Sequence, residues 1–235
     1  MQDNHQDNAT QTNTDSSRFL EAVRLICISP EDAKQLVANY RVQAKSKHAN
    51  LTADEIQDLI AEKIISRYID LSTISGGLSS LTSIIPGIGT VLAMVGGAVA
   101  DGAVCMKFQV DMCLCMAEAY GYDVSSEDGK HLAFLVASGG ALGKFSSEAA
   151  TNIASKAGVR LIKQYLKGAA LQAIKEFFKR LGIIFTRKAL EKALPFGIGV
   201  VISASANRIL TKYVAKKAKG FFVLDRTMKR DGELV

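Results

Sequence analysis

The sequence predicts an all-α protein, a single multi-helix bundle around two glycine-rich apolar helices. Three observations predict this fold class. No window of the 235 residues alternates apolar and polar side chains as a half-buried strand would. The hydrophobic fraction is 48% with only 7% aromatic residues, and this small, aliphatic content favours close helix packing over a β-sandwich. An apolar, glycine-rich segment that starts with proline occurs twice.

This segment runs from Ile85 to Ala100 in its first copy and from Leu194 to Ala206 in its second. Its proline suits the first turn of a helix, and small residues four positions apart form ridges that let two helices approach closely. Glycine inside a helix costs about 1 kcal/mol relative to alanine, so we expect a compensating contact. The residues expected to pack helices or to enter a membrane are Pro86, Gly87, Gly89, Ala93, Gly96, Gly97, Pro195, Gly197, Gly199 and Ser203.

Composition divides the chain into four parts. Residues 1–17 are mostly small polar residues with almost nothing to bury, which predicts a disordered tail. We expect an N-terminal helical segment over 18–75 and a helical domain over 76–222. Residues 223–235 are interpreted as a tail, because the apolar period fades there.

Two helix starts in the N-terminal segment are marked by their capping residues. Ser29 can cap a helix that has Pro30 at its first position, and we expect this helix to end near Lys47. Thr52 and Glu55 have the spacing of a capping box, which opens the next helix. Further helices are predicted where caps and apolar periodicity coincide: 18–28, 78–85, 88–120, from Ser125 or Ser126 to Leu142, two or three within 147–192, and 196–219.

The apolar segments are short for a bilayer. The properly apolar part of the first copy, 84–100, is 17 residues long, whereas a spanning helix typically needs about 20. Asp101 then interrupts the first run and Asn207 ends the second, and both side chains are costly in hydrocarbon. Three interpretations stay open: a buried hairpin in the core of a soluble domain, which we favour; a hairpin that enters or lies on a membrane; and constitutive spans.

Asp101 and Asn207 are the candidate buried polar residues. Asp101 either bonds a neighbouring helix end or Asn207 within the core, or it is an ionisable site that changes protonation with its environment. On the same predicted helix Lys107 and Asp111 are four residues apart and can form an ion pair.

Charge is divided unevenly along the chain. Residues 1–143 carry 10 basic and 17 acidic residues, a net charge of −7, whereas residues 144–235 carry 19 basic and 6 acidic residues, a net charge of +13. Either the second half binds a polyanionic partner or the two halves attract each other within one fold. Two stripes at helical spacing are candidates for lipid binding: Lys156, Arg160, Lys163 and Lys167, and Arg208, Lys212, Lys216 and Lys219.

Signatures of catalysis are missing. A phosphate-binding loop over 138–145 fails, because Ser138 and Phe145 stand where that loop needs a glycine and a hydroxyl. Cys113 and Cys115 point about 200° apart on a helix, so they cannot share a metal ion. We therefore expect no enzyme, no metal and no cofactor. Nucleic acid is disfavoured as a partner, because no aromatic residues interleave with the basic ones and no reading helix is recognisable.

Several of these motifs together resemble the EcsC protein family over roughly 70–222. The resemblance rests on Ile85–Gly89, Gly96–Asp101, Tyr120–Asp123 and, as the family's C-terminal signature, Asn207–Thr211. A related domain type that accompanies some bacterial GTPases has the same proline–glycine character. The EcsC resemblance implies a bacterial protein that works at membranes, and it brings no catalytic residues. The chain departs from the family pattern in its second copy, where Ser203 and Ser205 replace glycine or alanine.

The sequence-based hypothesis is a non-enzymatic, cytoplasmic, bacterial protein that associates peripherally with the inner face of the membrane. Its basic C-terminal helices would meet an anionic membrane surface, and its glycine-rich hairpin could insert. One alternative is a pore-forming effector that stores an apolar hairpin in a soluble bundle. The other is a soluble scaffold or an accessory protein of a membrane transporter. A membrane protein or a second copy of the chain is a further candidate partner.

Overall fold

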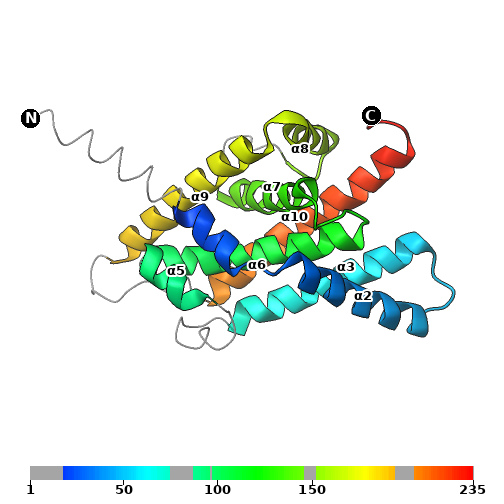
Figure 1. Cartoon of the computed structure of the whole chain (residues 1–235), viewed down its shortest axis with the longest axis horizontal. Coiled ribbons are helices and arrows are strands. Elements are labelled where there is room, and N and C mark those ends of the chain that lie inside the picture. The colour runs from blue at the N-terminus through cyan, green and yellow to red at the C-terminus, as the bar shows by residue number, and fades with distance from the viewer. Residues whose placement is uncertain (1–17, 75–86, 96, 146–151, 194–203, 235) are drawn as a thin grey trace, which may run out of the picture.

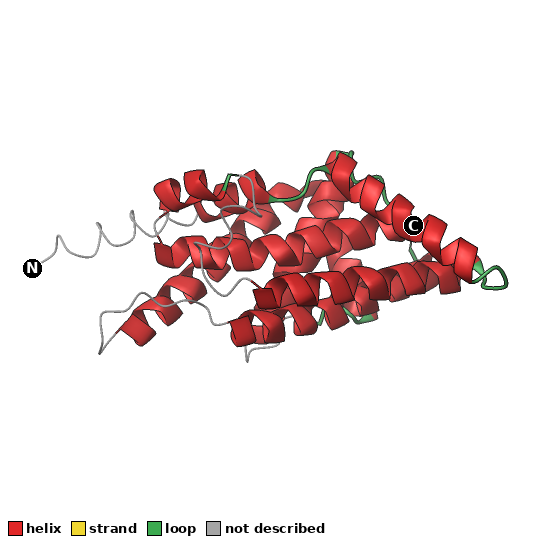
Figure 2. Cartoon of the chain, turned by 90° about the horizontal axis from the view of Figure 1, so that it is seen from below, coloured by secondary structure: helices red, strands yellow, loops and turns green. Residues whose placement is uncertain are grey.

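The computed structural model describes residues 18–74, 87–95, 97–145, 152–193 and 204–234. Within these ranges the chain forms helices joined by turns and loops, and no strand is present (Figure 2). The predicted all-α bundle is therefore confirmed. The tail predicted over 1–17 and the helix predicted over 78–85 lie outside the described ranges.

After a first helix over 18–26, the elements follow one another along the chain (Figure 1). Their bounds are α2 (Pro30–Lys47), α3 (Ala53–Ile74), α5 (Ile88–Val95), α6 (Gly97–Ala119), α7 (Glu127–Phe145), α8 (Lys156–Gly168), α9 (Ala170–Ala193) and α10 (Ala204–Arg230).

The predicted caps of α2 and α3 are both present. The Ser29 hydroxyl accepts a hydrogen bond from the Asp32 amide at 3.1 Å, and α2 ends at Lys47 as expected. At the start of α3, the Thr52 amide donates to a Glu55 carboxylate oxygen at 2.8 Å, and the Glu55 amide donates to the Thr52 hydroxyl at 3.3 Å. Local sequence therefore determines where these helices begin, since each cap satisfies an amide that has no partner within its helix.

The long helix predicted over 88–120 is divided in two. One described helix ends at Val95 and the next begins at Gly97. After α6 the chain turns at Gly121, whose φ of +87° is one that glycine adopts without strain.

The predicted end of the last helix is wrong. Instead of ending near Lys219 and giving way to a tail at 223, α10 continues to Arg230. Phe221, Asp225 and Met228 continue its buried face. Because Asp225 is polar, it interrupts the apolar spacing by which a buried helix face is recognised in a sequence. Gly232, at φ +69°, then ends the helix with a Schellman-type cap, in which the Gly232 amide donates to the Lys229 carbonyl at 3.3 Å.

Helix α6 lies at the centre of the bundle and contacts α2, α3, α5, α7, α9 and α10 (Figure 1). Every residue from 102 to 117 on this helix is buried. A helix that is surrounded on all sides needs partners for its polar side chains. Two of these partners come from α10: the Gln109 amide donates to the Thr211 hydroxyl at 2.9 Å, and the Cys105 thiol donates to the Asn207 amide oxygen at 3.1 Å.

The ion pair predicted between Lys107 and Asp111 is present and buried, with 11% and 3% of the two side chains exposed. Asp111 also accepts a hydrogen bond from the Ile28 amide at 2.9 Å, and this bond ties the connection between the first helix and α2 to α6. Burial raises the pKa of the Asp111 carboxyl, whereas the Lys107 ammonium acts in the opposite direction.

The expectation of close packing at the first apolar copy is wrong for Gly89 and Ala93, whereas a carbon added at Gly87 would lie 3.6 Å from Ile26 of the first helix. Gly89 and Ala93 are exposed, and a side-chain carbon added at Gly89 would meet no atom of another described residue within 4 Å. Close approach occurs elsewhere: an added carbon would lie 3.0 Å from Phe185 at Gly102 and 3.3 Å from Val214 at Gly140. Which glycines face a neighbour depends on how each helix is rotated, and local spacing does not determine this.

We predict that Gly129→Ala destabilises the protein by about 1–3 kcal/mol, as overpacking does. A Cβ at this position in the first turn of α7 would lie 2.1 Å from the Asp123 carbonyl oxygen, so the turn before the helix has to move. Gly89→Ala is the matched control; it is an exposed helical glycine in open space, and its replacement should stabilise by up to about 1 kcal/mol. Urea unfolding measures both, and equal effects of the two substitutions would contradict the packing.

We also predict that Lys107→Met destabilises by about 3–5 kcal/mol near neutral pH, because it leaves a buried carboxylate without its cation. The folded-state pKa of Asp111 is already raised, so the folded protein holds this proton more tightly than the unfolded chain does. Stability from Asp111 is therefore present at low pH and is lost as the pH rises.

The penalty of Lys107→Met should accordingly be small near pH 4 and grow toward pH 7, as measured by urea unfolding across this range. Lys130→Met, which removes the cation of the exposed pair with Glu127, should cost little at any pH. If the loss of unfolding free energy in Lys107→Met does not change with pH, the loss does not come from leaving the Asp111 carboxylate without its cation.

Candidate functional site: the basic faces of α8 and α10

Helix α8 carries the first predicted basic stripe. Its N-cap is Ser155, whose hydroxyl accepts from the Gly158 amide at 3.1 Å. Val159 and Ile162 are buried on one side of the helix. The four basic side chains of the stripe lie toward the other side, and their exposure decreases from Lys156 and Arg160 to the half-buried Lys163.

The stripe is occupied by acidic groups of the same chain. Glu233, held just after α10 by the Gly232 cap, lies 2.6 Å from Lys156 and 3.4 Å from Arg160. Lys163 lies 2.9 Å from Asp225. Lys167 is exposed at the end of the stripe. Three of the four cations therefore join α8 to the end of α10. The lipid-binding role expected for this stripe stays a prediction.

The centre of this contact is a buried cluster around Asp225. This side chain is 2% exposed and lies 2.9 Å from the Lys163 ammonium and 3.1 Å from the Lys229 ammonium. The Tyr122 hydroxyl donates to Asp225 and accepts from both lysines, and the two ammonium groups lie 4.6 and 4.1 Å from the centre of its ring.

The electrostatics of the cluster follow from burial and from the sharing of one carboxylate by two cations. Burial lowers the pKa of Lys163, and the neighbouring Lys229 ammonium lowers it further, whereas Asp225 raises it. The pKa of Tyr122 is raised, first by burial and then by its hydrogen bond to Asp225. The cluster joins the turn after α6 to both α8 and α10, so we interpret it as structural.

A second set of contacts joins the same end of α10 to the start of α3. Arg226 lies 3.2 Å from Asp58, and Arg230 pairs with Asp54. The Tyr120 hydroxyl donates to Asp58 at 2.8 Å. The acidic first turns of α3 thus receive the basic last turns of α10, and the helices run antiparallel.

The other half of α10 presents the second predicted stripe in a different way. Arg208, Lys212 and Lys216 are exposed, whereas Asn207 and Thr211 on the opposite side are buried against α6. Within the described part of the chain, none of these three cations makes an ion pair.

Lys219, the fourth residue of this stripe, pairs with Glu62 of α3 at 2.5 Å. Ile209, which is 56% exposed, stands next to Arg208 on the outer side of the helix. We define the outer face of α10 as Arg208, Ile209, Lys212 and Lys216. It combines unpaired positive charge with one exposed apolar side chain.

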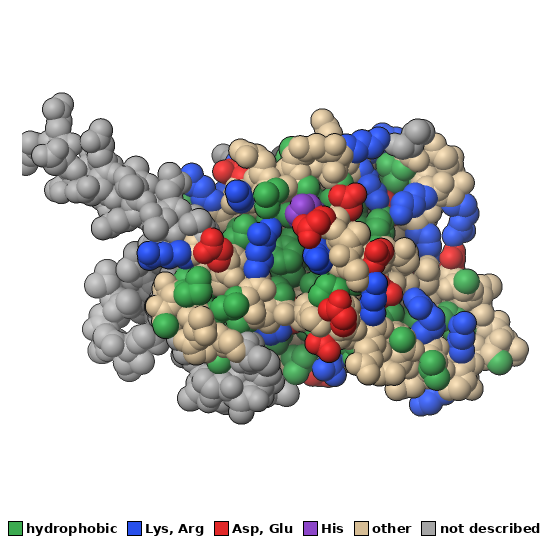
Figure 3. All heavy atoms as spheres, viewed as in Figure 1, with side chains coloured by type: hydrophobic (Ala, Val, Ile, Leu, Met, Phe, Trp, Pro, Cys, Tyr) green, Lys and Arg blue, Asp and Glu red, His purple; other side chains and the backbone are tan. Residues whose placement is uncertain are grey.

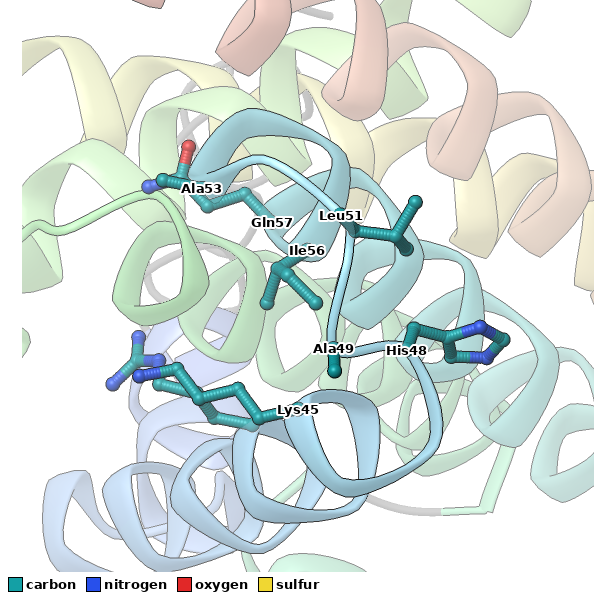
Figure 4. A pocket seen from close by; sticks show the side chains of 8 residues that line it. Lys45, His48, Ala49, Leu51, Ala53, Ile56 and Gln57 are labelled. Carbon is teal, nitrogen blue, oxygen red and sulfur yellow. The ribbon is translucent and has the colours of Figure 1, made fainter.

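Other basic residues do not converge in the same way. On the face drawn in Figure 3, acidic side chains lie among the basic ones across the middle of the molecule. A hollow of about 660 Å³ at the turn between α2 and α3 is lined by Arg41, Lys45 and His48, among others. Lys45 and His48 point to opposite sides there, and Ile56 points into the space between them (Figure 4). This hollow is therefore a poor site for an anion.

Asp101 is half-buried near the start of α6, and burial raises the pKa of its carboxyl to about 6. This is the direction that a change of protonation requires. Its predicted partner Asn207 is 4% exposed and bonds to Cys105, one turn along α6 from Asp101.

Only part of the apolar repeat falls within the described ranges. Gly87 precedes α5 with a φ of +82°, and Gly97 is the first residue of α6. The remaining predicted residues of the repeat lie outside the described ranges: Pro86, Gly96, Pro195, Gly197, Gly199 and Ser203.

Sequence reasoning missed the Asp225 cluster and the acidic partners of α8. A local signal was present, because Phe221, Asp225 and Met228 keep helical spacing and Gly232 follows as a helix-ending residue. The distance in sequence between Lys163 and Asp225 left their pairing invisible.

No family model, curated protein or solved structure matches the chain. The EcsC resemblance therefore stays a prediction. In the part of the chain that the structure describes, no helix is both long enough and apolar enough to cross a membrane.

We predict that Asp225→Asn destabilises by about 3–5 kcal/mol, because it leaves the largely buried Lys163 ammonium without its carboxylate. Glu233→Gln is the control; it removes the same charge from an ion pair whose basic partners are more than half exposed, so it should change stability little. Urea unfolding of the two variants decides, and equal losses would contradict the structural role of the cluster.

Proposed function

We propose that the chain is a non-enzymatic protein that docks on an anionic membrane surface through the outer face of α10. One observation carries the proposal: Arg208, Lys212 and Lys216 are exposed and make no ion pair within the described ranges. Acids of the same chain, in contrast, bind five other basic residues of α8 and α10: Lys156, Arg160, Lys163, Lys219 and Arg226. The positive charge of Arg208, Lys212 and Lys216 is available to phosphate groups.

The expected affinity is modest. Each basic residue near an anionic leaflet contributes about 1 kcal/mol, so three contribute about 3 kcal/mol. Ile209 adds apolar surface that the interface can cover. Because charges at a surface are screened over about 8 Å at physiological ionic strength, docking should be reversible and should weaken with salt.

The α8 stripe has a supporting role in this proposal. Lys156, Arg160 and Lys163 would have to leave Glu233 and Asp225 before they could reach a phosphate. Their contacts hold α10 in place, and α10 in turn presents its outer face. The proposed lipid-binding set therefore narrows from eight predicted basic residues to three.

We predict that the triple variant Arg208→Gln, Lys212→Gln, Lys216→Gln binds anionic vesicles about a hundredfold more weakly than the unaltered chain. Flotation with phosphatidylglycerol-containing vesicles measures this partition, with purely zwitterionic vesicles as the lipid control.

The matched control is the triple variant Lys34→Gln, Lys156→Gln, Arg160→Gln. It removes three positive charges that are already paired with Asp123 or Glu233, so the net charge falls by the same amount. It should keep most of the binding. Equal loss in both triple variants would show that net charge alone drives binding, and no flotation of the unaltered chain would overturn the proposal.

A further inference from the structure

A groove runs along α10 between α3 and the connection that precedes α8. Its volume is about 600 Å³, within the range of small-molecule sites. The apolar part of its lining comes from Ile65 and Ile69 of α3 and from Ala215, Val223 and Leu224 of α10. Three lysines of the α10 stripe also line it: Lys212, Lys216 and Lys219.

The positive charge of the groove is uneven, whereas apolar side chains line it along its whole length. Lys219 pairs with Glu62 across the antiparallel helices, at 2.5 Å. Lys212 precedes Lys219 by seven residues on α10, and Ile69 follows Glu62 by seven residues on α3. Because the helices are antiparallel, both lie about 10 Å from the ion pair in the same direction, so Lys212 is level with Ile69. The ammonium of Lys219 is neutralised by Glu62, so unpaired charge gathers at the Lys212 end. Val223 and Leu224 lie beyond the pair in the other direction.

We propose that this groove holds one acyl chain of an anionic membrane phospholipid, with the phosphate of that lipid at Lys212 and Lys216. The proposal rests on the proposed function and deepens it by naming the ligand. Charge complementarity favours this occupant, because the lysines without an acidic partner in the described part of the chain, Lys212 and Lys216, lie at one end of the groove. The charges of Lys219 and Glu62 compensate each other midway along it.

Dimensions and burial agree with an acyl chain. From Lys212 to Thr227 the groove follows fifteen residues of helix, or about 22 Å, whereas the hydrocarbon of one leaflet is about 15 Å deep. Ile65, Ile69, Val223 and Leu224 are each half-buried. A chain laid over them would remove the rest of their apolar surface from water, and the lipid would exchange one apolar environment for another.

Photo-crosslinking on vesicles tests the proposal with the full chain. The vesicles contain phosphatidylglycerol, a small fraction of which carries a photoreactive diazirine near the end of one acyl chain. Protein that floats with them is irradiated, and the labelled peptides are mapped. We expect label within 219–227, at the end of the groove away from Lys212.

If the protein floats with the vesicles but the label maps elsewhere, the proposal that the groove holds an acyl chain is overturned, whereas the docking proposal is not affected. Label at Ile209, within the apolar segments 84–100 and 194–203, or spread over exposed residues such as Val42 and Leu171 would have this meaning. No flotation overturns the docking proposal, and the groove falls with it. The two failures are thus distinguishable.

A pair of variants checks the same point. Ile69→Glu places a carboxylate in the groove beside Lys212 and should lower groove labelling about tenfold. Ile184→Glu, at a half-buried isoleucine of α9, should leave it unchanged. Circular dichroism confirms that each variant is folded, and a folded Ile69→Glu with undiminished labelling would overturn the proposal. If Ile69→Glu does not fold, the label map of the unaltered chain decides.

Discussion

Burial of α6 on all sides is the constraint on which the rest of the structure depends. A helix enclosed from residue 102 to residue 117 has no solvent to satisfy its polar side chains. Gln109 therefore turns to Thr211, Cys105 to Asn207, and Asp111 to Lys107 and the Ile28 amide. Two of these contacts reach α10 and fix the side of that helix that faces inward. The cations on its other side then have to face outward.

Part of the uneven charge of the two halves is compensated within the fold. Bases of α10 meet acids of α3 in pairs such as Lys219 with Glu62 and Arg226 with Asp58, so the halves do attract each other within one fold. Exposed ion pairs of this kind contribute little to stability. Their larger effect is on how far α10 and α3 are shifted along each other. These pairs leave a remainder of positive charge at the opposite end of α10, where Ile65 and Ile69 of α3 line the groove. The membrane proposal depends on that remainder.

The features that could be predicted from the sequence are those that neighbouring residues determine, such as the starts of helices. Ser29 and Thr52 mark helix starts through hydrogen bonds to amides three residues away. Sequence reasoning failed where the answer depends on distant residues. The acids that occupy α8 come from beyond residue 224, and Glu62 and Lys219, which set the groove, are 157 positions apart. It also ended α10 too early, because Asp225 at a buried position looks like solvent-facing polarity until Lys163 and Lys229 are known to surround it.

The central claim is that the open face of α10, and not the paired face of α8, meets the membrane. Hydrogen–deuterium exchange with and without phosphatidylglycerol vesicles tests it most directly, because contact suppresses local opening at the covered helix. The account predicts slower exchange over 204–219 of α10 and over the neighbouring turns of α3, with α8 unchanged. Slower exchange over 156–167, with α10 unaffected, would contradict it.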